Sequence, residues 1–341
     1  AMNLKTFVIL LIVCAILGGA AYLSLNTGKQ PKSAGKLFDN LAVNDISAIR
    51  INAPEGSVSL KKGDIWLVES RYNFPANFSM ITEFLLKLKD LKIDRSFKST
   101  EETLSRLVLR SPEDKEKPDN QKGTHLVLED KDKKIIADLI LGSTRETPSG
   151  GGGHYLKFAK DDTIYLVDKN FRFLDKESSK WIDKELIKAS ADDVESVSCI
   201  DPISKSVVYA FRRPEKGKDP EMLNMPPDRN LAKPKVSSLF SALASFQCDD
   251  LADPSKTIAD TGMDMARMFE FRLFDGRIYR IYPGKAVAES PEKYYFKADA
   301  GFAAPPDKPD DASKAEKPED KQKKEADKKQ KQAELSEQTA A

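Results

Sequence analysis

The strongest constraint on this chain is an uncharged run of 19 residues, Phe7 to Leu25, followed by more than three hundred residues with no second run of this kind. A helix of this length reaches roughly 30 Å, the thickness of the hydrocarbon core of a bilayer. The run has no polar face, which argues against a helix buried in a soluble core. We therefore predict one transmembrane helix in the lipid bilayer and one large body in water.

Three fates of this segment are open. Cleavage of a signal peptide would use the small residues 18–21, but the run exceeds the ordinary apolar length of about 7 to 15 residues. Lipid attachment is disfavoured, because Cys14 follows bulky residues in the middle of the run. We favour a retained signal anchor. Its lipid-facing residues would be Phe7, Ile9, Leu10, Leu11, Ile12, Val13, Ile16 and Leu17.

The charges beside the run bear on its orientation. Lys5 precedes it, as in an exported protein. Lys29, Lys32 and Lys36 follow it, which opposes a simple positive-inside count. Large bodies can cross a membrane despite such charges, and we expect the body on the extracytoplasmic side.

The composition of the whole chain excludes some partners. Its 55 basic and 54 acidic residues give a net charge of +1, so no overall field attracts nucleic acid. Three cysteines are too few for a disulfide framework. Cys199 and Cys248 could pair, but their apolar neighbours favour two separate buried thiols.

The body reads as two copies of one α+β unit. The alternating strand at 45–51 matches the one at 193–199, and each is followed by a second strand, at 57–60 and 206–211. The first copy adds a strand at 65–68. Apolar residues at helical spacing then predict helices over 78–91, capped by Asn77, and over 236–246, with Pro234 near the start. The returning strands are predicted at 124–128, 135–141, 155–158 and 163–167, and at 269–274, 277–282 and 295–297.

The predicted fold class is therefore α+β, with an N-terminal transmembrane helix followed by two repeated units, each an antiparallel sheet packed with one amphipathic helix. Gly142 and Gly284 are predicted to end matching strands, and residues 176–189 to form a short helical join. Residues 303–341 are too polar to offset the entropy of ordering and should be disordered. The expected segments are an anchor at 1–28, a linker at 29–38, units at 39–178 and 179–302, and a tail at 303–341.

Few residues of the body suggest chemistry. No metal-ligand spacing, phosphate loop or nucleophile motif is present, so we predict no catalytic residues, no metal and no cofactor. His125 lies in a predicted strand, where a structural role is the plainer interpretation. The loop Gly150, Gly151, Gly152, Gly153 and His154 could approach a ligand closely. Trp66, Phe74 and Tyr294 are further candidates for a partner or ligand surface, although core packing is the default for such residues.

The order of these pieces resembles a bacterial family known only as domain of unknown function 4340. The matching residues are the anchor, 66–68, 74–76 before the first helix, Leu141-Gly142, the glycine run with 155–157, and 163–167. The family usually carries a glycine in the turn before the returning strand. It appears here as Gly262 in the second copy, whereas the first copy has residues 107–109 and a charged loop at 112–122, so that element is expected to be altered.

Family members are often encoded beside ABC-2-type transporters and components like the gliding-motility auxiliary proteins. The resemblance thus implies a single-pass protein of the bacterial cytoplasmic membrane with a periplasmic body. We expect a non-enzymatic accessory or scaffold subunit that binds a protein of an ABC-type transporter or envelope complex. The alternatives are a module that binds a small ligand or glycan and, less favoured, an envelope hydrolase with a carboxylate pair.

Overall fold

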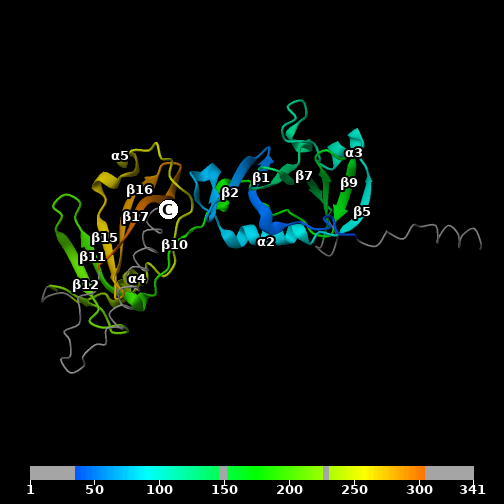
Figure 1. Cartoon of the computed structure of the whole chain (residues 1–341). Coiled ribbons are helices and arrows are strands. Elements are labelled where there is room, and N and C mark those ends of the chain that lie inside the picture. The colour runs from blue at the N-terminus through cyan, green and yellow to red at the C-terminus, as the bar shows by residue number, and fades with distance from the viewer. Residues whose placement is uncertain (1–34, 146–151, 226–229, 304–341) are drawn as a thin grey trace, which may run out of the picture. The chain divides into compact units, whose positions relative to one another are not determined.

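The computed structural model describes residues 35–145, 152–225 and 230–303. The chain divides into two compact units between Trp181 and Ile182. Both consist mainly of β-strands with few helices, so the fold class is α+β (Figure 1). Within the described ranges no helix is both long and apolar enough to cross a membrane. The predicted anchor at 7–25 and the predicted tail beyond residue 303 lie outside them.

Unit 1 contains a nine-stranded antiparallel sheet in the order β4-β3-β2-β1-β6-β7-β8-β9-β5. Its strands are β1 (Ile46–Ala53), β2 (Gly56–Lys62), β3 (Trp66–Val68), β4 (Phe74–Pro75), β5 (Ile93–Lys98), β6 (Thr124–Asp130), β7 (Ile135–Thr144), β8 (His154–Phe158) and β9 (Thr163–Val167). The helices are α2 (Phe78–Lys89) and α3 (Glu101–Arg106), with short 3-10 turns η1 (Val43–Asp45), η2 (Glu69–Arg71), η3 (Asp119–Gln121) and η4 (Ser178–Lys180).

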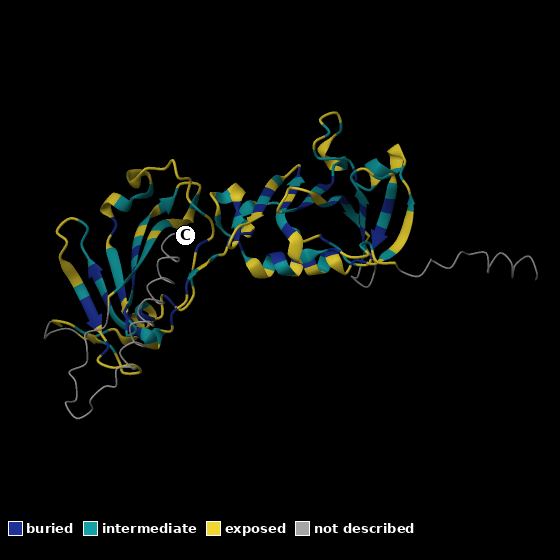
Figure 2. Ribbon diagram, viewed as in Figure 1, coloured by how far each residue is buried: buried dark blue, intermediate teal, exposed yellow. Residues whose placement is uncertain are grey.

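The main core of unit 1 lies between this sheet and α2 (Figure 1). The alternation in β1 buries Ile49 and Ile51 on one face and leaves Arg50 between them exposed. Figure 2 shows buried residues along the strands and exposed residues on α2 and in the loops. Ile140 lies on the opposite face from its neighbours in β7, because successive side chains of a strand alternate. There it forms a second, smaller core with Leu109 and Ile164. Unit 1 therefore buries apolar side chains on both faces of its sheet.

Unit 2 contains a six-stranded antiparallel sheet in the order β13-β12-β11-β15-β16-β17. Its strands are β11 (Val194–Ile200), β12 (Val207–Arg212), β13 (Glu221–Met222), β15 (Met268–Leu273), β16 (Arg277–Val287) and β17 (Ser290–Phe302), with a separate pair β10 (Glu185–Ile187) and β14 (Phe246–Gln247). The helices are α4 (Lys233–Phe240) and α5 (Ile258–Thr261), with short turns η5 (Ala191–Asp193) and η6 (Met263–Met265). Val236 and Phe240 of α4 pack with Val197 and Phe271 of the sheet to form the core.

Five strands in each sheet follow the same order, β2-β1-β6-β7-β8 in unit 1 and β12-β11-β15-β16-β17 in unit 2. Each unit also places a helical turn before the returning strand, α3 in one and α5 in the other. After each helical turn the chain passes through a residue with the left-handed backbone conformation, Val108 with φ 58° in unit 1 and Gly262 with φ 73° in unit 2. Unit 1 thus has Val108 where unit 2 has Gly262, and the two residues share the left-handed conformation.

A glycine in the neighbouring strand accommodates each of these turns. A Cβ added to Gly142 would lie 2.3 Å from the carbonyl oxygen of Leu107, and one added to Gly284 would lie 2.2 Å from that of Thr261. Neither glycine ends its strand, contrary to the prediction, since β7 continues to Thr144 and β16 to Val287. These glycines permit close approach of a backbone and do not terminate the ladder.

The strands expected from alternation are confirmed, and both predicted helices are present. The second helix is shorter than predicted, because α4 ends at Phe240. Leu243 is buried but lies in a turn after the helix, and Phe246 lies in β14. The join at 176–189 is not a helix, because it consists of η4 and strand β10. Cys199 and Cys248 are buried and unpaired, as their apolar surroundings indicated.

Candidate functional site

Helix α2 forms one wall of the candidate site. Its apolar residues recur at helical spacing, and Asn77 caps its start by accepting a hydrogen bond from the Met80 N–H at 3.0 Å. Lys87 and Lys89 lie in the last turn, where positive charge favours the helix dipole. Ile81, Phe84, Leu85 and Leu88 are buried, whereas Phe78 and Leu86 remain 65% and 48% exposed. The helix therefore presents large apolar groups both to the core and to solvent.

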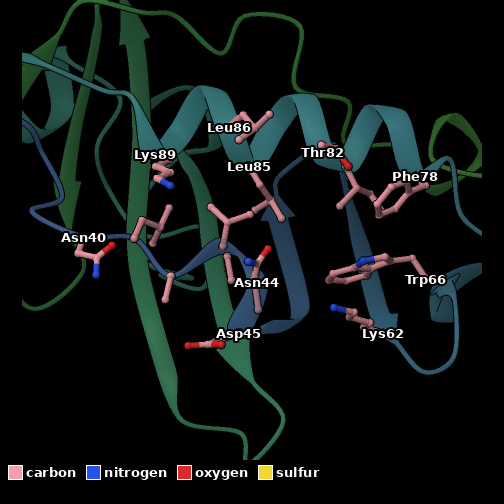
Figure 3. Close-up of a pocket in the computed structure, with 15 residues that line it drawn as sticks. Asn40, Asn44, Asp45, Lys62, Trp66, Phe78, Thr82, Leu85, Leu86 and Lys89 are labelled. Carbon is pink, nitrogen blue, oxygen red and sulfur yellow. The ribbon is translucent and has the colours of Figure 1, made fainter.

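A groove of about 520 Å³ lies between α2 and the segment 40–46 that leads into β1 (Figure 3). Trp66, Ile81 and Leu85 contribute to its apolar wall. The remaining lining residues are Asn40, Leu41, Ala42, Val43, Asn44, Asp45, Ile46, Lys62, Phe78, Thr82, Leu86 and Lys89. Ligand pockets in proteins have volumes of about 300–1,000 Å³, so this groove can hold a small molecule or a few side chains of a partner.

Three charged side chains line the groove. Lys62 is the register partner of Trp66 across β2 and β3, and it lies next to that indole in Figure 3. Lys89 comes from the last turn of α2, and Asp45 from η1. None of the three has an ion-pair partner among the residues that the structure describes. Two cations and one carboxylate beside an apolar wall suit a ligand that is mainly apolar and carries an anionic group.

A second polar cluster lies on the sheet of unit 1. His125 of β6 directs its Nδ1 to Glu113 Oε1 at 3.0 Å and its Nε2 to Asp138 Oδ1 at 2.7 Å. Asn52 of β1 donates to the same Glu113 oxygen at 2.8 Å, and Ser111 donates its hydroxyl to Oε2. Since carboxylate oxygens only accept, both ring nitrogens of His125 donate, as in a charged imidazolium.

The charges of this cluster reinforce one another. Burial lowers the pKa of His125, but the hydrogen bonds to Glu113 and Asp138 outweigh burial and raise the pKa above its ordinary value. Burial likewise opposes ionisation of Glu113, yet hydrogen bonds from Ser111, His125 and Asn52 lower its pKa to about 2. The cluster thus attaches the loop that carries Glu113 to the sheet. Both His125 nitrogens are engaged, so neither is available as a base in this arrangement.

The predicted surface residues occupy different parts of the fold. Trp66 lines the groove, where it is 6% exposed. Phe74 is half-buried in the short edge strand β4, and Tyr294 is 64% exposed on β17. The structure therefore brings only Trp66 to the groove. Any role of Phe74 or Tyr294 in binding remains a prediction.

The glycine loop leads into β8. Gly150 and Gly151 lie outside the described residues, and Gly152 and Gly153 precede His154, the first residue of the strand. His154 is buried, and its Nδ1 accepts the Phe171 N–H at 3.0 Å. Burial lowers the pKa of His154 to about 4, so its ring is neutral at neutral pH. Gly152, Gly153 and His154 do not line the groove, and the binding role of the loop also remains a prediction.

Most residues of the groove were missed by sequence reasoning. The segment 40–46 meets α2 only in the folded unit, and nothing in its sequence indicates that contact. Phe78 was predicted as the first residue of the apolar face of this helix, but the structure leaves it exposed at the groove. Within the described ranges, no cluster of three or more His, Cys, Asp or Glu residues could hold a metal ion.

Comparison with known proteins gives one match. The model of a family described as "Domain of unknown function (DUF4340)" matches residues 66–265, which include the groove residues of α2 and Trp66. No curated protein and no solved structure matches the chain.

Proposed function

The chain belongs to the DUF4340 family, and from that premise we propose that it is a non-enzymatic accessory or scaffold protein that binds a partner protein. The partner would be a component of an ABC-type transporter or envelope complex. In this proposal residues 7–25 hold the chain in the bacterial cytoplasmic membrane, and the body lies on the periplasmic side. The two units would be copies of one ancestral unit, which the shared order of five strands supports.

The groove beneath α2 is the observation that carries this proposal. Burying the exposed parts of Phe78 and Leu86 against a partner would be favourable, by roughly half of the about 1.5–3 kcal/mol that full burial of such a side chain contributes, because both are already partly buried. Lys62 and Lys89 lie at opposite ends of the groove (Figure 3), and each could pair with an acidic residue of the partner segment. Apolar anchors surrounded by charges are typical of protein interfaces. The expected partner segment is therefore short and apolar, with at least one acidic residue.

Site-specific photo-crosslinking tests this proposal. A photoreactive amino acid in place of Phe78, in the full chain in native membranes, should give one discrete crosslinked product. The same amino acid in place of Ile135, which is also exposed but lies outside the groove, is the matched control. A discrete product at position 78 that is absent at position 135 supports the proposal. Equal products at both positions, or no product at position 78, contradict it.

The volume of the groove favours one alternative, the binding of a small amphipathic molecule. A carboxylate beside Lys62 and an alkyl chain along Ile81 and Leu85 would suit such a ligand. Thermal shift of the full chain with fatty acids of increasing length tests this alternative. A shift that grows with chain length and is lost in Lys62→Glu would favour it, and no shift with any length would exclude this ligand class.

A further inference from the structure

Among the described residues, nothing pairs with the outer edge of strand β17 in the unit 2 sheet. It is the last strand in the order and, with 13 residues, a long one. No backbone group in the described ranges bonds to its outer edge. Long exposed edges tend to pair with further strands, and proteins usually shorten or interrupt them. The edge strands of unit 1 are shorter, since β4 has two residues and β5 has six.

Unit 1 shows what such an edge can accept. Its strand β8, which holds the position of β17, pairs with β9. Ile164 of β9 lies opposite Lys157 and closes the second core of unit 1. The sequence Tyr155-Leu156-Lys157 of β8 matches Tyr295-Phe296-Lys297 of β17. Unit 2 has no described strand at the place of β9, so an added strand would continue its sheet.

Apolar side chains near this edge of unit 2 are exposed, whereas a side chain at the corresponding place in unit 1 is packed against a core. Leu104 of α3 packs against the second core of unit 1, whereas Ile258 of α5 is 65% exposed. Tyr294 on β17 is 64% exposed. The chain that follows β17 is a poor source for the missing strand, because residues 304–341 contain one leucine and no aromatic residue. The occupant must therefore come from elsewhere.

We propose that the free edge of β17 pairs antiparallel with β17 of a second copy of this chain, joining the two six-stranded sheets into one. Full overlap of the two strands places the two-fold axis at their midpoint, Phe296. In that register Lys293 lies opposite Asp299 of the second copy, and the pair occurs twice by symmetry. Tyr295 lies opposite Lys297 of the second copy, in the place that Ile164 takes beside Lys157. Tyr294 faces the small Ala298 of the second copy.

Charge complementarity distinguishes this register from its neighbours. Moving the axis to Tyr295 would place Lys293 opposite Lys297 of the second copy. Moving it to Lys297 would place the Lys297 residues of the two copies opposite each other. Like charges directly opposite each other destabilise a strand pair. Within one chain Lys293 pairs with Asp249 at 3.5 Å and Lys297 with Asp299 at 3.2 Å. Both are exposed pairs of little energetic value and do not prevent the exchange.

Charge reversal with rescue tests the proposal in the full chain in detergent micelles. Sedimentation equilibrium should show a concentration-dependent dimer. Lys293→Glu and Asp299→Lys should each raise the dissociation constant about tenfold, since each replaces two attractive pairs by two repulsive ones. The double variant should return to near the wild-type value. Six residues of a strand span roughly 20 Å, so residues 293 and 299 cannot contact each other within one chain, and rescue must act between chains.

Glu292→Lys is the control for Asp299→Lys, because it makes the same change in net charge but faces the uncharged Ala300 of the second copy. It should leave the dissociation constant within about twofold of the wild type. A monomer at every concentration would overturn the proposal. So would a dimer that both single variants leave intact, or one that the double variant fails to restore.

Discussion

Replacing Gly142 by alanine tests how the helical turn after α3 is seated on the sheet. The new Cβ would lie 2.3 Å from the carbonyl oxygen of Leu107 and 2.7 Å from Cδ2 of the buried Leu109. Because the first of these atoms belongs to the backbone, the turn must move and disturb the second core. Overpacking of this kind costs typically about 1–3 kcal/mol. We expect about 2 kcal/mol, the middle of that range.

Urea unfolding followed by tryptophan fluorescence measures this loss in unit 1 alone, since the two tryptophans, Trp66 and Trp181, both belong to that unit. With a slope of about 2 kcal/mol per molar urea, the midpoint of Gly142→Ala should fall by about 1 M. Gly284→Ala makes the same contact in unit 2 and should leave the fluorescence midpoint in place. Gly63→Ala, whose added Cβ meets nothing closer than 3.8 Å, should also be near neutral.

Two results would refute this reasoning. One is a fluorescence midpoint of Gly142→Ala within about 0.2 M of the wild type, which would correspond to less than about 0.5 kcal/mol. The other is a shift of similar size in Gly284→Ala, which would show that the two units do not unfold separately. A loss in Gly142→Ala alone supports both the close contact and the division of the chain into units.

Three further predictions concern unit 1. Protonated His125 stabilises the fold, and because its pKa is raised, this contribution is fully present below pH 6.5 and is lost as the pH rises through the raised pKa. The wild type should therefore gain stability when the pH is lowered from alkaline to about 6, and His125→Asn should abolish this gain, as measured by urea unfolding at each pH. The lowered pKa of Glu113 acts oppositely: its contribution is present above pH 4.5 and lost as the pH falls through about 2, so Glu113→Gln should be less stable than the wild type at pH 6 and converge with it in strong acid. Removing the helix cap in Asn77→Ala should cost about 1 kcal/mol in the same assay, and no loss would contradict the cap.

Local patterns predicted the strands and the first helix because their causes are local. The alternation in β1 and the spacing from Phe78 to Leu88 are direct consequences of a strand and a helix with one buried face. The same reasoning failed where a helix, a turn or a strand could each bury the same apolar residue. Leu243 and Phe246 continue the spacing of α4, but a turn and β14 contain them instead.

The glycines were misread for a different reason. Gly142 and Gly284 were predicted to end strands. Each instead leaves room for a backbone carbonyl oxygen from a turn that is distant in the sequence. Strand β5 and helix α3 were not predicted at all. The capping box of Thr100 and Thr103 was a local signal for α3, whereas β5 is mainly charged and pairs with β9 about 70 residues later.

The groove depended on contacts that no single segment contains. Segment 40–46, Lys62 and α2 are separated in the sequence, and the sheet brings them together. Trp66 was singled out as a large apolar residue, but its position beside Lys62 follows from the register of β2 and β3. Sequence patterns could therefore predict the walls of the groove separately, but not the cavity between them.

The central claim is that the groove of unit 1 binds a partner, and paired charge insertions test it most directly. Leu86 and Ile135 are both 48% exposed, and only Leu86 lines the groove. Each is replaced by glutamate in the full chain, and the proteins that co-purify from native membranes are quantified by mass spectrometry. We predict that Leu86→Glu loses a specific component that wild type and Ile135→Glu retain. Identical components in all three would contradict the claim.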